Sequence, residues 1–402
     1  MLNDDKRSQG AGSQAALRSA NRRRILAALA ANGSRSQSEL SRDTGLSGGA
    51  VSGLVRELAD MKVITVAPGR RGSRPVVEVS LVPSDQIVLA IDAGHRHLRA
   101  ALADSSGAVI AEVVDARHLT WRVDDDLPVL LDLYQSLLGQ ADRQADQIAV
   151  CAIGLPVPFG SLGPGRLARG WAGSGVVEAL AEALGATVLL ENDANLGALG
   201  EAREGAGVGC DDFMYLKVAH GLGAGLVLAG QLYRGGRLAV GEIGHVSVDE
   251  AGALCSCGGR GCVELYAGGR AIAASLANVH GRRPTLAEII DGCRDQEPSF
   301  VRAVADAGRQ LGFVLANVVS LLAPTRIIIG GELSRAGAVL IDATRLGVQY
   351  GSARTLGDQV EVVEASLGDR AELAGAVALG VAELRARLDL PAADLLATRI
   401  RS

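Results

Sequence analysis

One stretch of the chain, GHVSVDEAGALCSCGGRGCVE from Gly244 to Glu264, gathers the side chains best suited to bind a metal. It holds three of the six cysteines and one of the six histidines. Three thiolates and one imidazole suit a tetrahedral zinc ion, and the glycines between them allow a tight loop. No open coordination position is evident, so we expect a structural zinc. The alternative, four unrelated reduced residues, is disfavoured by their local density. The predicted ligands are His245, Cys255, Cys257 and Cys262.

Other polar side chains are placed to bind a polyhydroxylated ligand. Asn192 and Asp193 end an apolar segment and open a helix. An aspartate there could act as general base on a sugar hydroxyl, although either residue could simply cap the helix. Glu242 and Glu264 flank the metal loop. We expect zinc to fix one wall of a carbohydrate pocket, formed by Glu242, His245 and Glu264, with Asn192 and Asp193 opposite.

The elements that must position these residues follow a repeated pattern. Strands are expected over residues 88–92, 98–103 and 109–113, and again over 213–218 and 226–229, where the glycine-rich turn AHGLGAG (219–225) joins them. Two strand–glycine turn–strand units, each followed by helices, predict a duplicated α/β architecture with a cleft between its halves. Such turns can cradle phosphates, but alone they are a weak indication.

The first 82 residues have a different character. Helices are expected over residues 22–30, after Ser36 with Glu39 as a capping box, and after Ser47. Residues 63–66 and 76–79 read as strands around a turn, PGRRGSRP (68–75). This order is typical of a winged helix-turn-helix, which would read the major groove with its second helix. The alternative is a three-helix packing module with a basic loop. The predicted DNA contacts are Ser36, Ser47, Gly49, Ser52, Arg56, Arg70, Arg71 and Arg74.

Charge separates the two parts of the chain. The 402 residues carry a net charge of -5, yet residues 1–82 hold 13 basic and 7 acidic residues. Only this segment is therefore suited to a polyanion. Six cysteines are too few for a disulfide scaffold. Because no signal peptide or membrane-spanning run is evident, we expect a cytoplasmic protein that does not enter a membrane.

The motifs together resemble the ROK family of repressors, open reading frames and sugar kinases. GEIGH with CSCGGRGCVE is similar to its zinc and sugar signature, ENDAN to its catalytic-aspartate motif, and IIIGGELSRAG (327–337) to the segment that borders its nucleotide site. The resemblance implies an actin-like, ribonuclease-H-like duplicated α/β fold. It also implies that Asn192, Asp193, Glu242, His245 and Glu264 bind the sugar, with one ring nitrogen of His245 on zinc and the other on the ligand.

Both phosphate loops depart from the family's kinases. Those enzymes read Asp-x-Gly-Gly-Thr where this chain has Asp92-Ala93-Gly94 followed by His95-Arg96-His97, and Ala219-His220 replaces the Gly-Thr of the second loop. Imidazoles at these points would crowd ATP. The resemblance therefore implies a sensor descended from a kinase, with Asp193 kept.

We accordingly expect a sugar-responsive transcriptional regulator, a repressor of carbohydrate-metabolism genes. It would bind a palindromic operator as a homodimer or homotetramer and respond to a sugar or sugar phosphate. The alternatives are an ATP-dependent sugar kinase with a fused DNA-binding domain, in which Asp193 is catalytic, and a constitutive regulator with a vestigial pocket. The expected domains are residues 1–82 for DNA binding, 83–195 with about 375–402 for the first lobe, and 196–374 for the second lobe with the zinc loop.

Overall fold

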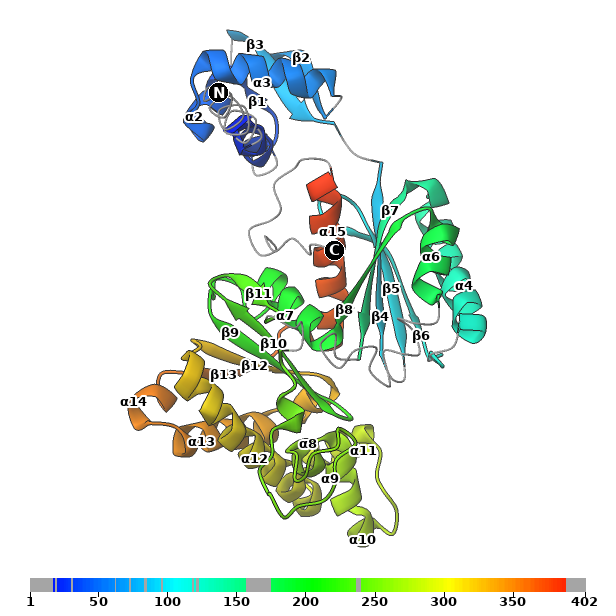
Figure 1. Cartoon of the computed structure of the whole chain (residues 1–402), viewed down its shortest axis with the longest axis vertical. Coiled ribbons are helices and arrows are strands. Elements are labelled where there is room, and N and C mark those ends of the chain that lie inside the picture. The colour runs from blue at the N-terminus through cyan, green and yellow to red at the C-terminus, as the bar shows by residue number, and fades with distance from the viewer. Residues whose placement is uncertain are drawn as a thin grey trace, which may run out of the picture. The chain divides into compact units, whose positions relative to one another are not determined.

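The computed structural model resolves the chain into two compact units (Figure 1). One contains the chain up to Gln86 together with the end of helix α15 (Ala371–Arg387) from Ala382, and the other runs from Ile87 to Val381. No helix among the described residues is long and apolar enough to cross a membrane. The described residues are 17–18, 20–29, 32–61, 63–71, 74–82, 85–94, 97–117, 119–120, 123–156, 175–235 and 240–387.

The first unit is a winged helix-turn-helix. Helices α2 (Gln37–Thr44) and α3 (Gly48–Asp60) follow a first helix of which residues 20–29 are described. The predicted capping box is confirmed, because Ser36 Oγ accepts a hydrogen bond from the Glu39 backbone while the Glu39 carboxylate accepts one from the Ser36 backbone. The three helices bury one apolar face each in a common core. That core includes Ile25, Leu26, Leu29, Leu40, Val51, Leu54, Val55 and Leu58.

The wing is longer than expected. Strands β2 (Ile64–Arg71) and β3 (Arg74–Leu81) pair antiparallel with β1 (Arg35–Ser36) on the other side of β3. The turn predicted over residues 68–75 was wrong in extent, since the pairing continues from Pro68↔Val77 out to Arg71↔Arg74. Proline lacks the N–H that a central strand needs, but β2 is an edge strand and tolerates it.

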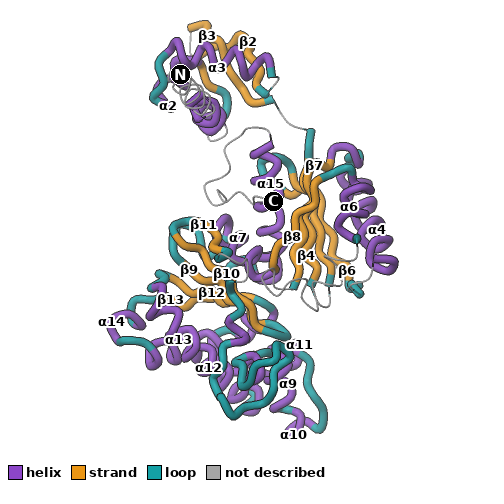
Figure 2. Tube along the Cα trace, in the orientation of Figure 1, coloured by secondary structure: helices purple, strands orange, loops and turns teal. Residues whose placement is uncertain are grey.

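The second unit contains two five-stranded sheets of the same topology (Figure 2). Their orders are β6-β5-β4-β7-β8 and β11-β10-β9-β12-β13. In each sheet the first three strands form an antiparallel meander and the last two are parallel additions, which confirms the predicted duplication. The strands are β4 (Ile87–Ala93), β5 (Leu98–Ala103), β6 (Val109–Asp115), β7 (Ile148–Leu155), β8 (Thr187–Asn192), β9 (Phe213–Val218), β10 (Leu222–Leu228), β11 (Gln231–Tyr233), β12 (Arg326–Gly330) and β13 (Glu361–Glu364).

The glycine-rich segment 219–225 is only partly a turn. Strand β10 begins at Leu222, so Gly223 and Gly225 lie in the strand and not in the predicted loop. A Cβ at Gly225 would stand 2.5 Å from the carbonyl oxygen of Ala194 in helix α7. These glycines therefore let α7 approach the sheet closely, a reason for glycine in a strand that the sequence does not reveal.

Helices cover both sheets (Figure 1). Helix α15 contacts the first sheet, because a Cβ at Gly380 would meet Val88 and Ala152 at 2.3 and 3.5 Å. Helices α12 and α13 bury their apolar faces in the core of the second sheet. The domain boundaries expected near residues 82, 195 and 374 stay predictions. The helices are α4 (Val123–Ala141), α6 (Val176–Leu184), α7 (Asp193–Glu204), α8 (Glu264–Ala267), α9 (Gly269–Ser275), α10 (Ala277–His280), α11 (Leu286–Arg294), α12 (Pro298–Leu322), α13 (Ala338–Gly351), α14 (Arg354–Gly357) and α15 (Ala371–Arg387).

Candidate functional site

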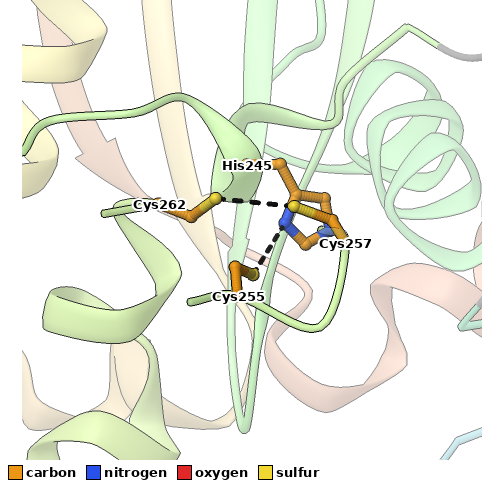
Figure 3. A group of neighbouring side chains, drawn as sticks. All are labelled: His245, Cys255, Cys257 and Cys262. Atoms are coloured by element: carbon orange, nitrogen blue, oxygen red, sulfur yellow. Dashed lines mark hydrogen bonds between the residues drawn. The ribbon is translucent and has the colours of Figure 1, made fainter. Parts of the chain in front are cut away.

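The four predicted metal ligands come together in the loop before α8 (Figure 3). Their ligand atoms all lie within 4.8 Å of one another. Cys255 Sγ is 3.6 Å from His245 Nδ1, and Cys257 Sγ is 3.6 Å from Cys262 Sγ. A tetrahedral zinc bonded at about 2.3 Å to sulfur and about 2.0 Å to nitrogen would separate two sulfurs by about 3.8 Å and a sulfur from a nitrogen by about 3.5 Å. The donor set and its spacing therefore fit zinc.

Glycines give the loop its shape, as the sequence predicts. Gly258 and Gly261 have φ of 94° and 58°, which side chains other than glycine rarely adopt. A Cβ at Gly261 would also stand 1.8 Å from the carbonyl oxygen of Asp249. Short β-bridges, Ser247↔Cys262 and Leu254↔Arg260, hold the two arms of the loop together. The backbone of the loop thus brings the three cysteines to one point.

His245 lies between the metal ligands and the carboxylates. It ends the short 3-10 helix Ile243–His245, with Nδ1 toward Cys255 and Nε2 3.8 Å from Glu242 Oε2. The Glu264 carboxylate accepts a hydrogen bond of 3.0 Å from the Leu222 backbone, at the start of β10. The two ring nitrogens thus face two different surroundings. This is the geometry that a shared role on metal and ligand requires.

Asp193 and the two glutamates form one electrostatic group. Burial raises the pKa of Glu242, and although the His245 ring lowers it, the negative charges of Asp193 and Glu264 raise it further. The structure thus brings Glu242 close enough to Asp193 and to Glu264 to be repelled by each of them. Neutral hydroxyl groups would relieve this repulsion by donating hydrogen bonds to the carboxylates.

Asn192 and Asp193 occupy the junction of β8 and α7. Asn192 caps the helix, since its Oδ1 accepts a hydrogen bond of 3.1 Å from the Asn195 backbone. Capping, the alternative left open by the sequence, is therefore present, and sugar binding by Asn192 stays a prediction. Asp193 is 8% exposed, and its Oδ2 accepts a hydrogen bond of 2.9 Å from Lys217 Nζ.

Lys217 is a functional candidate that the sequence analysis did not single out. It lies on β9 with Nζ 2.9 Å from Asp193 and 3.0 Å from Glu372 Oε1 on α15. Burial opposes its charge, but the carboxylates of Asp193, Glu372 and Asp92 outweigh burial and raise the pKa of Lys217. One signal could have found it: in an arginine-rich chain with only three lysines, this one interrupts the apolar strand FMYLKV.

The described residues after β4 are closely packed around His97. His97 Nε2 lies 2.9 Å from Asp92 Oδ2, and a Cβ at Gly94 would stand 2.3 Å from the His97 ring. Asp92 is 1% exposed; burial raises its pKa, but the His97 hydrogen bond and the Lys217 charge lower it more. The His97 ring therefore covers the Gly94 backbone. His95 and Arg96 lie outside the described residues.

The predicted DNA contacts fall into three groups. Gly49 and Arg56 are exposed on α3 and Ser52 is partly exposed there, while Ser47 caps that helix from an exposed position. Ser36 is 6% exposed and its hydroxyl is engaged in the capping box. Among the wing residues, the Arg70 side chain is exposed, whereas those of Arg71 and Arg74 lie outside the described parts. All eight contacts stay predictions.

Comparison with known proteins identifies both units. Residues 88–383 match the ROK family, and residues 18–65 match a winged helix-turn-helix DNA-binding family. The chain is 27% identical over 381 residues to the xylose repressor of Bacillus subtilis (strain 168), covering 90% of this chain and 95% of that protein. It is 31% identical over 230 residues to a glucokinase of Streptomyces coelicolor, covering 52% of this chain and 72% of the enzyme.

Solved structures show the same two likenesses. A ROK family transcriptional regulator, described as a homolog of the E. coli MLC protein, superposes with a TM-score of 0.75 at 26% identity, covering 93% of this chain and 97% of that one. A ROK hexokinase from Thermus thermophilus superposes with a TM-score of 0.61 at 28% identity, covering 74% of this chain and 100% of the enzyme. The regulator, unlike the hexokinase, matches nearly the full length of the chain. With its repeated sheets, its metal loop and its N-terminal winged helix-turn-helix, this chain belongs to the ROK family.

Proposed function

We propose that this protein is a sugar-responsive DNA-binding repressor of carbohydrate-metabolism genes. One observation carries the proposal: a body that matches the sugar-kinase family, with His97 packed against Asp92 and Gly94 where the kinases have a phosphate loop, is joined to a winged helix-turn-helix. A body that binds sugar without turning it over can act as a sensor. The full-length relatives named as xylose repressors support this assignment.

The metal loop would hold a structural zinc ion through His245, Cys255, Cys257 and Cys262. A zinc ion held there would supply rigidity and no reaction chemistry, because the four residues would provide all the ligands of a structural site. The loop then presents Glu242, His245 Nε2 and Glu264 as a fixed wall of the sugar site. A fixed wall loses little entropy on binding.

The exposed surface of α3 supports the proposal that this helix binds in a groove of DNA. Gly48, Gly49 and Gly53 are exposed, and a Cβ at any of them would meet no atom within 4 Å. Packing therefore does not require these glycines, whereas close approach of the helix to DNA would. One such helix reads only a half-site, so we propose a homodimer or homotetramer on a palindromic operator. A cytoplasmic location, where thiols stay reduced, fits both DNA and zinc binding.

The sugar would act by favouring one arrangement of the two lobes over another. Only a ligand with different affinity for the two arrangements can shift their populations. Asp193 lies between the lobes, since it opens α7 after the first sheet and is paired with Lys217 of the second sheet. A sugar held by Asp193 and the metal-loop wall would therefore be sensitive to lobe closure.

Sugar phosphorylation is the second candidate function, and the retained Asp193 favours it. Glucokinases and a hexokinase are among the relatives, and an aspartate at this position could take the proton of the attacking hydroxyl. Two features oppose this function: His97 in the phosphate loop and the ammonium already bonded to Asp193 Oδ2.

A thermal-shift screen of the zinc-loaded full chain distinguishes the two functions. A ligand that binds only the folded protein raises its melting temperature. We expect a shift with one sugar, none with Mg-ATP, and loss of the sugar shift in Asp193→Ala. A sugar-dependent shift with Mg-ATP, together with ATP turnover that Asp193→Ala abolishes, would establish the kinase instead.

A further inference from the structure

A single buried ammonium stands at the centre of the sugar-kinase-like body. Lys217 lies on the middle strand of the second sheet, and its side chain is 15% exposed. It bonds Asp193 and Glu372, whose side chains are 11% and 5% exposed. Tyr215 donates a hydrogen bond of 3.2 Å to the same Glu372 oxygen. The ammonium is thus fixed by partners from two other elements, α7 and α15.

Carboxyl groups outnumber cations around this ammonium. Asp92 faces it as well, and one of its oxygens, Oδ1, is buried without a hydrogen-bond partner among the described residues. Burial raises the pKa of Glu372, and the charges of Asp92 and Asp193 raise it further against the opposing effect of Lys217. The carboxyl groups around Lys217 therefore disfavour any further negative charge near them.

Phosphoryl-transfer centres hold metal ions that bridge the nucleotide's phosphates, and these ions supply much of the positive charge at the reacting group. We propose that Lys217 is a resident cation that supplies this charge from within the protein, and that the carboxylates which already share it make the pocket specific for neutral, unphosphorylated sugars. The proposal rests on the proposed function, in which the body binds a sugar effector. Lys217 acts here as the neutralising cation, and the carboxylate of Asp193 beside it determines the specificity.

The specificity follows from the different ways in which a sugar hydroxyl and a phosphate ester would meet the Asp193 carboxylate. A sugar hydroxyl beside Asp193 can donate to the carboxylate without adding charge. A phosphate ester at that hydroxyl would carry about -1.5 to -2 charge at neutral pH. It would lie beside the Asp193 carboxylate, while the only ammonium among the described residues there is already shared by Asp193 and Glu372.

The first test compares each sugar with its own phosphate ester. Glucose, mannose and N-acetylglucosamine, each beside its 6-phosphate, are titrated calorimetrically into the zinc-loaded full chain. We expect the neutral sugar that binds to bind about 100-fold more tightly than its ester, the effect of one unit of like charge about 6 Å away at an effective dielectric constant near 20. An ester that binds as tightly as the neutral sugar, or more tightly, overturns the proposal.

The second test needs no sugar. In Lys217→Thr the carboxyl groups of Asp92, Asp193 and Glu372 lose their cation, so millimolar Mn²⁺ should bind among them and raise the melting temperature by several degrees. Wild type should not respond, nor should Tyr215→Phe, which removes a hydrogen bond from the same group without changing its charge. Lys217→Gln provides the same comparison with a side chain of closer length, in case the threonine variant does not fold.

The outcomes separate this proposal from the proposed function. No response of Lys217→Thr or Lys217→Gln to Mn²⁺, or an equal response of wild type, refutes the resident cation whatever the ligand is. A phosphate ester that binds best and changes DNA affinity refutes the specificity while leaving the repressor function intact. If no sugar or ester affects DNA binding, the proposed function fails, and the Mn²⁺ comparison still decides the role of Lys217.

Discussion

Gly53 on α3 offers a perturbation with opposite effects on stability and on DNA binding. It is exposed in the interior of the helix, and a Cβ there would meet no atom within 4 Å. Alanine is about 1 kcal/mol more favourable than glycine inside a helix. Gly53→Ala should therefore raise the free energy of unfolding of the winged unit by about 1 kcal/mol, because nothing in the fold opposes the methyl group.

The same substitution should weaken DNA binding. Gly49, Ser52, Gly53 and Arg56 follow a helical spacing that places them on one side of α3, opposite the buried Val51 and Leu54. A methyl group at residue 53 would hold this side away from the groove and disturb the contacts of Ser52 and Arg56. Each good base contact contributes about 1–3 kcal/mol, so we expect DNA affinity to fall about 10-fold to 100-fold.

Two assays on the same protein measure these effects. Fluorescence anisotropy gives the affinity for a duplex selected from a random library with the wild-type chain, and urea denaturation gives the stability. Gly45→Ala is the matched control: its φ of 66° makes alanine unfavourable, so it should lose stability. A Gly53→Ala protein that gains stability and binds DNA as wild type does would refute the placement of this face of α3 in a groove.

The remaining predictions concern the body of the protein. Gly261→Ala, or removal of zinc by a chelator, should open the metal loop and abolish the sugar-induced thermal shift. Gly368→Ala is the control, because Gly368 also has a positive φ, of 53°, but no atom lies within 4 Å of its Cβ. This variant should keep the sugar-induced thermal shift. Gly225→Ala should cost about 1–3 kcal/mol by overpacking α7 against β10, measured by urea denaturation. Burial raises the pKa of Glu372 in the folded protein above its ordinary value of 4.5. The folded protein therefore holds this proton more tightly than the unfolded chain does. The stability that results is fully present below pH 4.5 and is lost as the pH rises through the folded-state pKa. Glu372→Gln has no group to titrate and should not lose stability in this way. In urea titrations, the free energy of unfolding of the variant relative to wild type should therefore increase with pH above 4.5. A difference between the two proteins that does not change with pH would contradict the raised pKa.

The sequence predicted features that depend on local spacing. The metal ligands lie within a stretch of eighteen residues, and the glycines between them indicate a tight loop. The sequence could therefore predict that the four side chains lie close together. The strands over 98–103 and 213–218 have the bounds that their apolar runs indicate. The capping box of Ser36 and Glu39 is likewise a local signal, and it formed as expected.

Features that depend on distant partners could not be predicted. Lys217 is 24 residues from Asp193, and Tyr215 is 157 residues from Glu372, so no periodicity joins them. Gly223 and Gly225 read as a turn because the helix that requires their small size lies elsewhere in the chain. The wing was predicted too short because Pro68 indicates a turn unless the strand is known to be an edge strand.

The most direct test of the central claim measures the coupling between sugar and DNA from both sides. DNA affinity is titrated with and without the sugar found in the thermal-shift screen, and sugar affinity is titrated with and without DNA. Linkage requires that the sugar change the DNA affinity by the same factor as DNA changes the sugar affinity. We expect both to be about 10-fold or more, within the usual range of allosteric coupling. A sugar that binds tightly while both factors remain at unity would contradict a sugar-responsive repressor.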